Sequence, residues 1–337
     1  MNVIWFWVLT AMLTAYAILD GYDLGVGALH LWVARTQQER RIALHSIGPV
    51  WNGNEVWLLA AGGMMMVSFP RVYASGFSGF YLALMLVLWL LILRGVSIEL
   101  RGLVDHPLWR SLWDTGFWFG SALLSLLLGV AMGNVLRGLP IGADGYFKGT
   151  FALLLNPYSL LTGALSLVVL AWHGATYLRV KTEGSLQLRV QDWSRRLWWG
   201  VAILVGVTTL ATFRVRPALT TGFREHPWGW GFPLLAAAGL VSGYFCGRAG
   251  RERGAFRSST LTIAGLMGSA ALSVYPNLLT SALDPAYSLT IYNSASSPLA
   301  LRYSLIVNLV GMAAVVIYST YVHRTFRGKV RLTDHGY

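Results

Sequence analysis

The sequence predicts an all-α, polytopic membrane protein, and three observations lead to this fold class. Of the 337 residues, 55% are hydrophobic and only 12% are charged, whereas an ordinary soluble domain has about 25% charged residues. Long apolar runs follow one another along the whole chain, and most charged residues lie in the short segments between them. A soluble fold of this size has no interior large enough to bury so much apolar surface.

Nine apolar segments predict membrane-spanning helices, because a helix needs roughly 20 mostly apolar residues to cross a bilayer. The nine segments are 3–33, 49–69, 76–97, 115–136, 151–178, 196–213, 229–247, 258–275 and 301–321. The first segment starts at once, carries acidic residues and lacks the basic start of a cleaved signal peptide. We therefore expect one membrane-embedded domain, 1–337, that ends in a polar tail at 322–337.

The basic residues between the segments predict the orientation of the chain. Nine spans place the two termini on opposite sides of the membrane. Of the 26 Lys and Arg residues, 19 fall on the side that includes the tail and 7 fall on the other side. Because positive residues stay cytoplasmic, we expect the N-terminus outside and the C-terminus inside. The net charge of +12 does not indicate nucleic-acid binding, since the basic residues do not gather on one soluble face.

Two acids lie inside the first predicted span. Asp20 and Asp23 are three residues apart, so they lie on one face of a helix. An acid in hydrocarbon is costly unless it is protonated or has a partner, and it therefore marks a candidate functional site. The alternative is a packing helix whose acids only bind neighbouring backbone or basic groups.

The second and third spans also carry polar residues. Asn52 and Glu55 share a helical face near the start of the second span, and Arg94 and Glu99 lie at the end of the third. Arg94 is a candidate charge partner for the acids, and the alternative is a long side chain that reaches the lipid headgroups. Two aromatic residues of the second span could lie at the membrane interface, and these are Trp51 and Trp57.

In the predicted orientation, the polar residues of these three spans meet at one depth, toward the cytoplasm. The first span runs inward, the second starts at the cytoplasmic face, and the third runs inward again. A chain of acids at that place is what a proton-uptake route needs. The candidates for such a route are Asp20, Asp23, Asn52, Glu55 and Glu99.

Few residues of the chain suit a metal ion or a cofactor. The single cysteine, Cys246, excludes an intrachain disulfide and a Cys-ligated metal site. Of the seven histidines, only His30 and His173 lie within or near the ends of spans, so the sequence offers no convincing pair of axial haem ligands. The consecutive methionines at 64–66 favour core packing. We therefore expect no metal site and no firmly bound cofactor in this chain.

Several blocks of the sequence resemble one known family. In the first half these are LDGYDLGVGAL at 19–29, ERR at 39–41, GPVWNGNEVWL at 48–58, FPRVYASGFSGFY at 69–81 and LILRGVSIELR at 91–101. In the second half they are GNVLRGLP at 133–140, LLNPYSLLTGALSLV at 154–168, GATYLRVKTEGSLQLR at 174–189 and SLTIYNSASSPLALR at 288–302. Their order and spacing are similar to subunit II of the cytochrome bd quinol oxidases over nearly the whole chain.

This resemblance implies two four-helix bundles and one peripheral helix, with the first bundle within 1–136 and the rest within 137–321. It also implies a partner, subunit I, which carries b-type haems, haem d or a b haem in its place, and the quinol site. Such a complex would oxidise quinol, reduce dioxygen and take up cytoplasmic protons in a bacterial inner membrane. The resemblance further allows a small single-span accessory subunit, a structural quinone and a bound lipid.

One position departs from the family's pattern. The usual Asp of the family's PxWDGN block is Asn52 here, and an asparagine side chain has no acidic proton to release. Glu55, one turn away, could carry the proton instead. Asp23 matches the second acid of the family's DGxDxG block, and Arg94 and Glu99 match its charged pair at the end of the third span.

Two alternatives to an oxidase subunit are a secondary transporter of a proton-coupled solute and a haem-free structural membrane subunit. Transporters also bury acids near the middle of the membrane, but many show inverted repeats and paired broken helices. The sequence shows neither repeat symmetry nor a matched second acidic site.

Overall fold

The computed structural model describes residues 1–331, so the last six residues of the predicted tail lie outside the described part. Within 1–331, nine α-helices have 18 or more residues, and each overlaps one predicted segment. They are α1 (Asn2–Val33), α3 (Trp51–Ser68), α5 (Tyr81–Leu100), α6 (Pro107–Arg137), α8 (Pro157–Lys181), α9 (Gly184–Val215), α11 (Gly231–Arg248), α12 (Glu252–Val274) and α13 (Pro298–Thr325). Seven of them, all except α3 and α12, are long and apolar enough to cross a membrane. The chain is therefore an all-α, multi-pass membrane protein.

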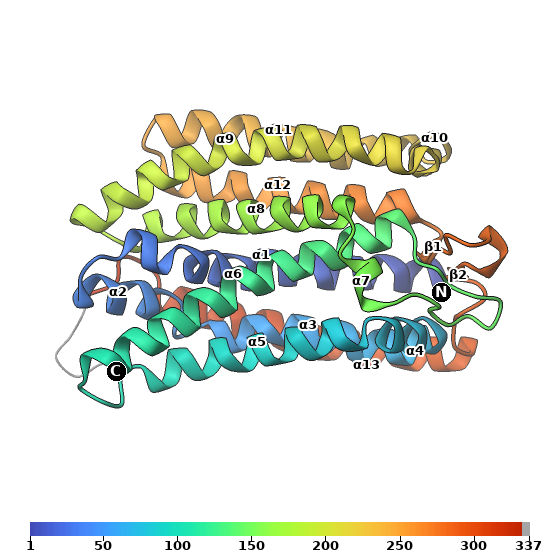
Figure 1. Ribbon diagram of the computed structural model, residues 1–337, viewed down its shortest axis with the longest axis horizontal. Helices are drawn as coiled ribbons and strands as arrows, with labels where there is room; N and C mark the ends of the chain where they lie inside the picture. Colours follow the sequence, from blue (N-terminus) through green and yellow to red (C-terminus); the bar gives the residue numbers. More distant parts are fainter. Residues whose placement is uncertain (332–337) are drawn as a thin grey trace.

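Shorter elements join the long helices at the two ends of the molecule. The helical ones are α2 (Gln37–Ile47), α4 (Pro70–Gly79), α7 (Phe151–Leu154), η1 (Pro217–Thr220), α10 (Thr221–Glu225), η2 (Pro227–Trp230) and η3 (Pro285–Tyr287). Two short strands, β1 (Asn277–Leu279) and β2 (Leu289–Thr290), pair antiparallel with Asn277 opposite Thr290. These elements lie toward the two ends of the helix assembly (Figure 1).

Three predicted segment boundaries differ from the observed helices. The third segment was expected to start at 76, but α4 ends at Gly79 and α5 starts afresh at Tyr81. The fifth was expected as one helix, yet it breaks before Pro157, because Asn156 caps α8 by accepting a hydrogen bond from the Ser159 N–H. The sixth was expected at 196–213, but α9 begins twelve residues earlier, so its first turns are polar.

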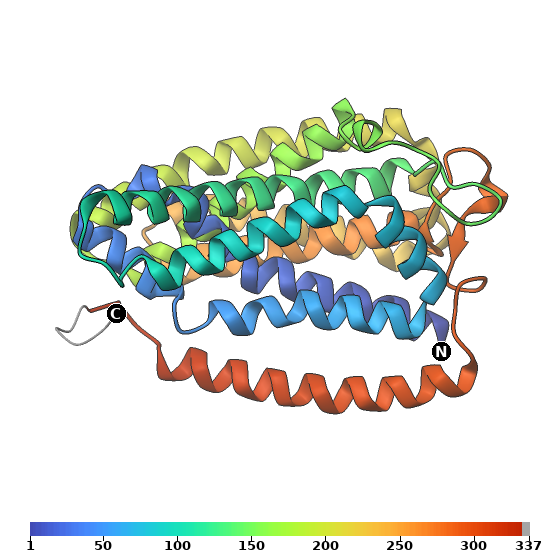
Figure 2. The same ribbon diagram turned by 60° about the horizontal axis from the view of Figure 1, so that its bottom comes forward.

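The long helices lie side by side along one axis, with α1 near the centre (Figure 1). Helix α1 packs against α3, α6, α8 and α12, and α5 packs against α6. Helices α8, α9, α11 and α12 pack against one another on one side of α1, and α13 lies at the periphery against α3 (Figure 2). The N-terminus and the end of the described chain lie at opposite ends of the molecule (Figure 2).

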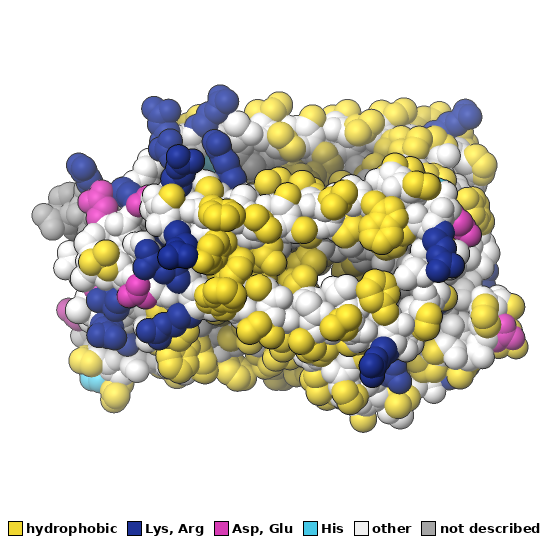
Figure 3. Space-filling view, turned by 90° about the horizontal axis from the view of Figure 1, so that it is seen from above, with side chains coloured by type: hydrophobic (Ala, Val, Ile, Leu, Met, Phe, Trp, Pro, Cys, Tyr) yellow, Lys and Arg dark blue, Asp and Glu magenta, His cyan; other side chains and the backbone are white. Residues whose placement is uncertain are grey.

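Basic side chains are unevenly distributed along this axis. Seen from the side of α9 and α11, Lys and Arg crowd the end that holds α2 and the start of α9, whereas the middle of the face is mostly hydrophobic (Figure 3). We call this end the basic end. An apolar middle between two polar ends is the pattern of a protein that spans a bilayer.

Two helix backbones lie in close contact where glycines of α1 and α8 meet. A Cβ atom added to Gly25 would lie 1.9 Å from the carbonyl oxygen of Leu170 and 2.8 Å from the Gly174 nitrogen. A Cβ atom on Gly174 would lie 2.3 Å from the Gly25 carbonyl carbon. Only glycine fits at both positions, since the two backbones are in direct contact.

We expect Gly25→Ala to lower the stability of the purified protein by about 1–3 kcal/mol, the usual cost of overpacking a tight contact. The measurement is the Tm in a fixed detergent, together with the yield of folded protein. Gly62→Ala is the matched control, because a Cβ atom at Gly62 meets nothing within 4 Å. An unchanged Tm for Gly25→Ala would contradict the close contact of α1 and α8.

Candidate functional site

A buried ion pair joins α1 to α5. Arg94 donates two hydrogen bonds to Asp20, from Nη2 to Oδ1 at 2.5 Å and from Nη1 to Oδ2 at 3.0 Å. Both side chains are completely buried. This two-pronged geometry is the strongest that an arginine and a carboxylate can form. The alternative of an arginine that extends to the headgroups is wrong, since the Arg94 side chain has no exposed surface.

Helix α3 adds a third member to this pair. Arg94 Nη1 also donates to Glu55 Oε1 at 3.2 Å, and 23% of the Glu55 side chain is exposed. Three helices therefore bring Asp20, Glu55 and Arg94 together, as expected from their positions in the first three spans. Glu55 is the member through which this cluster reaches the surface of the chain.

Asp23 belongs to a second, neighbouring network. Its Oδ2 accepts a hydrogen bond of 2.7 Å from the Asn54 amide, and its buried Oδ1 has no hydrogen-bond partner. The same amide donates to the Tyr22 hydroxyl at 2.8 Å, and this hydroxyl lies 2.9 Å from Nε2 of His323 on α13. The other ring nitrogen of His323 lies 2.7 Å from the Ser319 carbonyl oxygen, to which it must donate. Nε2 of the neutral ring is then the nitrogen that accepts from Tyr22.

Four other residues from the sequence prediction lie outside the two networks. Asn52 and Glu99 are exposed, and Glu99 lies in the last turn of α5, beyond Arg94. Trp51 is buried, and its ring lies where a side chain at Gly95 of α5 would be. Trp57 is partly buried, and its indole N–H has no partner. Half of the predicted residues therefore lie in the two hydrogen-bonded networks, and these four do not.

The sequence reasoning missed a third fully buried acid, Asp114. Its Oδ1 accepts from Arg101 Nε and lies near His30 Nε2, both at 2.6 Å, and its Oδ2 accepts from Arg40 Nη1 at 2.9 Å. The segment boundary at 115 placed Asp114 in a loop, but α6 starts at Pro107 and buries it completely. No local signal marked it, because two of its three partners, His30 and Arg40, are distant in sequence.

The two buried histidines form hydrogen bonds with other residues of the protein. Both nitrogens of His173 are engaged, Nδ1 with Ser259 Oγ at 2.7 Å and Nε2 with the Ile18 carbonyl at 3.0 Å. One nitrogen of His30 is engaged by Asp114. In the described part of the chain, no group of three or more His, Cys, Asp or Glu residues is arranged to hold a metal ion.

At the basic end, Glu39 ties α2 to α9. It completes the capping box with Thr36 and forms an ion pair with Arg189 of α9. Burial alone would raise the pKa of Glu39, but the hydrogen bonds from Arg189 and from the backbone N–H groups of Arg35 and Thr36 outweigh it. The pKa therefore lies below the usual value of 4.5.

The chain matches a known protein family over almost its whole length. The family described as "Cytochrome bd terminal oxidase subunit II" matches residues 1–326. The chain is 36% identical to "Probable cytochrome oxidase subunit 2" of Haemophilus influenzae, over 98% of this chain and 95% of that protein. It is 32% identical to "Cytochrome bd-I ubiquinol oxidase subunit 2" of Escherichia coli K12, over 99% and 96%.

A solved structure has the same fold. The chain superposes on the bd oxidase from Geobacillus thermodenitrificans with a TM-score of 0.79. The match covers 96% of this chain and 98% of that chain, at 19% sequence identity. At this identity the likeness concerns the fold alone.

We expect Asp114→Asn to lower stability by about 3–5 kcal/mol, because it leaves buried cations without a countercharge. The matched control is Asp105→Asn. Asp105 is 88% exposed and pairs with Arg110 at the surface, where an ion pair contributes only about 0–1 kcal/mol. Thermal unfolding of both variants checks this, and equal Tm values would show that Asp114 has no special role in stability.

The Glu39 ion pair predicts a pH dependence. Because folding lowers its pKa, Glu39 contributes stability above about pH 4.5, and this contribution is lost as the pH falls through the lower folded value. Wild-type protein should therefore have a higher Tm than Glu39→Gln at pH 7, and the difference should shrink on acidification below pH 4.5. Glu183→Gln, an exposed acid of the same end, is the control and should give no such difference.

Proposed function

Because this chain belongs to the family of subunit II of the cytochrome bd terminal oxidases, we propose that it forms a quinol oxidase complex with a haem-bearing subunit I in a bacterial inner membrane. The chain and its relatives match over almost their entire lengths, so no large segment is present in one and absent from the other. Because the chain belongs to this family, we do not propose that it is a secondary transporter. The role within the complex is to support subunit I and to help deliver protons.

We propose that all nine long helices of the described part span the membrane. Helix α3 lies against α1 and α13, and α12 lies against α1, α8 and α11, so both run among spanning neighbours. With nine spans and the positive-inside preference, the basic end faces the cytoplasm and the N-terminus faces the periplasm. The Asp20 cluster then lies in the cytoplasmic half of the bilayer.

We expect the haems of the complex, haem b with haem d or another b haem, to be held by subunit I. Of the two histidines that the sequence placed in or near spans, His173 uses both ring nitrogens within the protein, and His30 has only Nδ1 without a partner, so the two do not provide a pair of axial ligands. No step of the proposal therefore involves a haem of this chain. Quinol, a structural quinone and an accessory subunit remain expectations from the resemblance.

The proton-delivery proposal depends on one observation, the different partners of the three acids on α1 and α3. Arg94 compensates Asp20 fully, so Asp20 is a fixed anion that organises the site. Asp23 has no ion pair among residues 1–331 and has one unpartnered oxygen. Glu55 is partly exposed and shares Arg94. We propose that Glu55 accepts protons from the cytoplasmic side and Asp23 passes them on toward subunit I.

This assignment changes the roles that the sequence suggested. Asn52 and Glu99 are exposed and make no contact with the cluster, so we propose no proton transfer through them. Asp20 becomes a structural anion rather than a carrier. The asparagine at 52 consequently does not interrupt the route.

We expect Asp23→Asn and Glu55→Gln each to lower quinol-dependent oxygen consumption per haem by about tenfold, because an amide cannot accept and release a proton in place of a carboxyl. Tenfold corresponds to about 1.4 kcal/mol in the activation free energy. The rate is measured on complex with wild-type haem content, and proton uptake is followed in liposomes.

Two further variants make the test specific. Glu99→Gln is the matched control and should keep the wild-type rate, since Glu99 lies outside both networks. Asp20→Asn should instead reduce the amount of assembled complex, because Arg94 loses its main countercharge in a buried place. Normal turnover and proton uptake in an assembled Asp23→Asn, Glu55→Gln double variant would refute the proposed route.

A further inference from the structure

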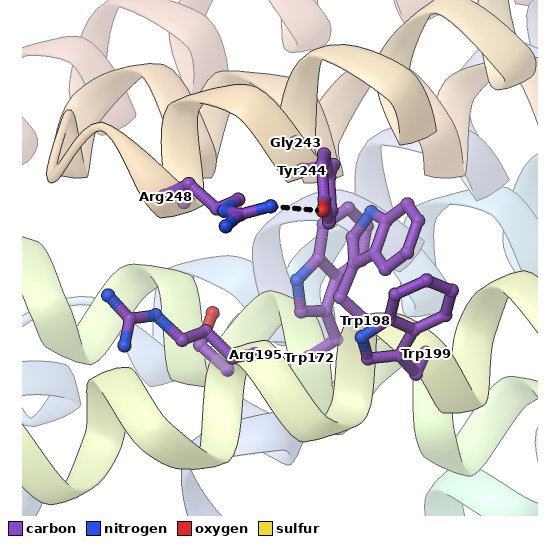
Figure 4. A pocket seen from close by; sticks show the side chains of 9 residues that line it. Trp172, Arg195, Trp198, Trp199, Gly243, Tyr244 and Arg248 are labelled. Carbon is purple, nitrogen blue, oxygen red and sulfur yellow. Dashed lines mark hydrogen bonds between the residues drawn. The ribbon is translucent and has the colours of Figure 1, made fainter.

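A groove of about 550 Å³ opens between α8, α9 and α11, on the side of the molecule away from α3 and α13 (Figures 1 and 4). Its wall is aromatic. Trp172 of α8 is almost fully buried at its base, and Trp198 and Trp199 come from α9. Tyr244 of α11 closes the opposite side, with its ring centroid 4.8 Å from that of Trp198. Such a wall suits a hydrocarbon chain.

Two arginines lie at one end of this groove, with the indoles beyond them (Figure 4). Arg248 Nη1 donates to the Tyr244 hydroxyl at 2.6 Å, and its guanidinium carbon lies 5.4 Å from the centroid of the same ring. Arg248 has no acidic partner among residues 1–331. Arg195 lies across the groove from it, on α9 (Figure 4), and its only ion pair among residues 1–331 is with Asp192 at 4.0 Å. Both members of that pair are at least half exposed, so they neutralise each other little.

A third arginine lies beneath the same end. Arg179 is 2% exposed, and its buried Nη1 has no hydrogen-bond partner. A Cβ atom added to Gly247, which lines the groove, would lie 3.9 Å from this Nη1. The nearby acid, Glu252, already binds Lys329 at 2.7 Å and Gln187 at 2.5 Å. This end of the groove thus carries positive charge in excess and lacks an anion.

The position of the groove identifies the anion's source. Helices α8, α9 and α11 are among the seven that are long and apolar enough to span. Arg195 comes directly before the apolar segment of α9, and Arg248 is the last residue of α11. The arginines therefore lie at the depth of lipid headgroups, and the indoles lie deeper, along the acyl chains.

We propose that this groove binds one anionic phospholipid, whose phosphate lies between Arg195 and Arg248 and whose acyl chain runs along Trp198 and Trp199. Basic pockets between transmembrane helices recognise anionic headgroups in this way. A zwitterionic lipid fits less well, since its ammonium group would lie among three guanidinium groups. The proposal is independent of the proton route and needs only that α8, α9 and α11 span the membrane.

The test measures lipid retention by the intact complex. Delipidated complex is titrated with phosphatidylglycerol or phosphatidylcholine of the same acyl chains, and bound lipids are counted by native mass spectrometry. Wild type should retain one phosphatidylglycerol at about tenfold lower lipid concentration than phosphatidylcholine. In the double variant Arg195→Gln, Arg248→Gln, this preference should disappear.

The control variant removes the same charge from the same end. Arg196 and Arg253 are exposed and do not line the groove, so Arg196→Gln, Arg253→Gln should keep the preference. An equal loss in this control would show general attraction to a basic surface and would overturn the proposal. Displacement of the lipid by millimolar glycerol 3-phosphate would also overturn it, since the site would then bind a soluble phosphate compound.

A second variant fills the groove without changing its charge. Gly247→Leu places a side chain into open space, because only Arg179 Nη1 comes within 4 Å of the new Cβ atom. We expect it to abolish retention of phosphatidylglycerol while the haem content of the complex stays at the wild-type value. Retention equal to wild type in this variant would place the bound lipid elsewhere and overturn the proposal.

Discussion

The buried pair of Arg94 and Asp20 is the interaction on which the polar interior of this protein depends. A charge within the apolar layer is tolerated only with a countercharge at close range. The pair fixes α5 against α1, and Glu55 brings α3 to the same guanidinium group. Both Nη atoms of Arg94 are engaged by Asp20 and Glu55, and Asp23 lies one turn further on without an ion pair among residues 1–331. In our proposal, Asp20 is therefore a structural anion, and Asp23 is the carboxyl group that can take up and release a proton.

Much of the fold followed from the sequence, because hydrophobic length is a strong signal in a membrane protein. Every one of the nine long helices in residues 1–331 overlaps an expected segment. The contact between Asp20, Glu55 and Arg94 could also be predicted. Successive spans run in opposite directions, so the position of a residue along its span gives its depth in the membrane. The boundaries were harder. Polar helical turns that continue beyond the bilayer, such as the start of α6, have no apolar signal.

The remaining site residues could not be predicted for a similar reason. Asn54 directly precedes Glu55, so the two side chains point about 100° apart around the helix. A search for residues that share a helical face therefore selected Asn52 instead. Only the rotation of α3 against α1 decides which face is buried, and single-sequence periodicity was too weak here to fix it. Asp114 required two helices distant in sequence to converge with α6, which no local pattern contains.

The polar start of α9 shapes the surface that the protein exposes outside the lipid bilayer at its basic end. From Gly184 to Arg195 the helix extends about 18 Å before its apolar segment begins, and Glu39 and Arg189 brace it against α2. The connection between α8 and the apolar part of α9 is therefore an ordered helix held against α2, not a flexible loop. An antibody fragment or another soluble protein arriving from that side would meet a preformed epitope, and its recognition would require little ordering of the chain.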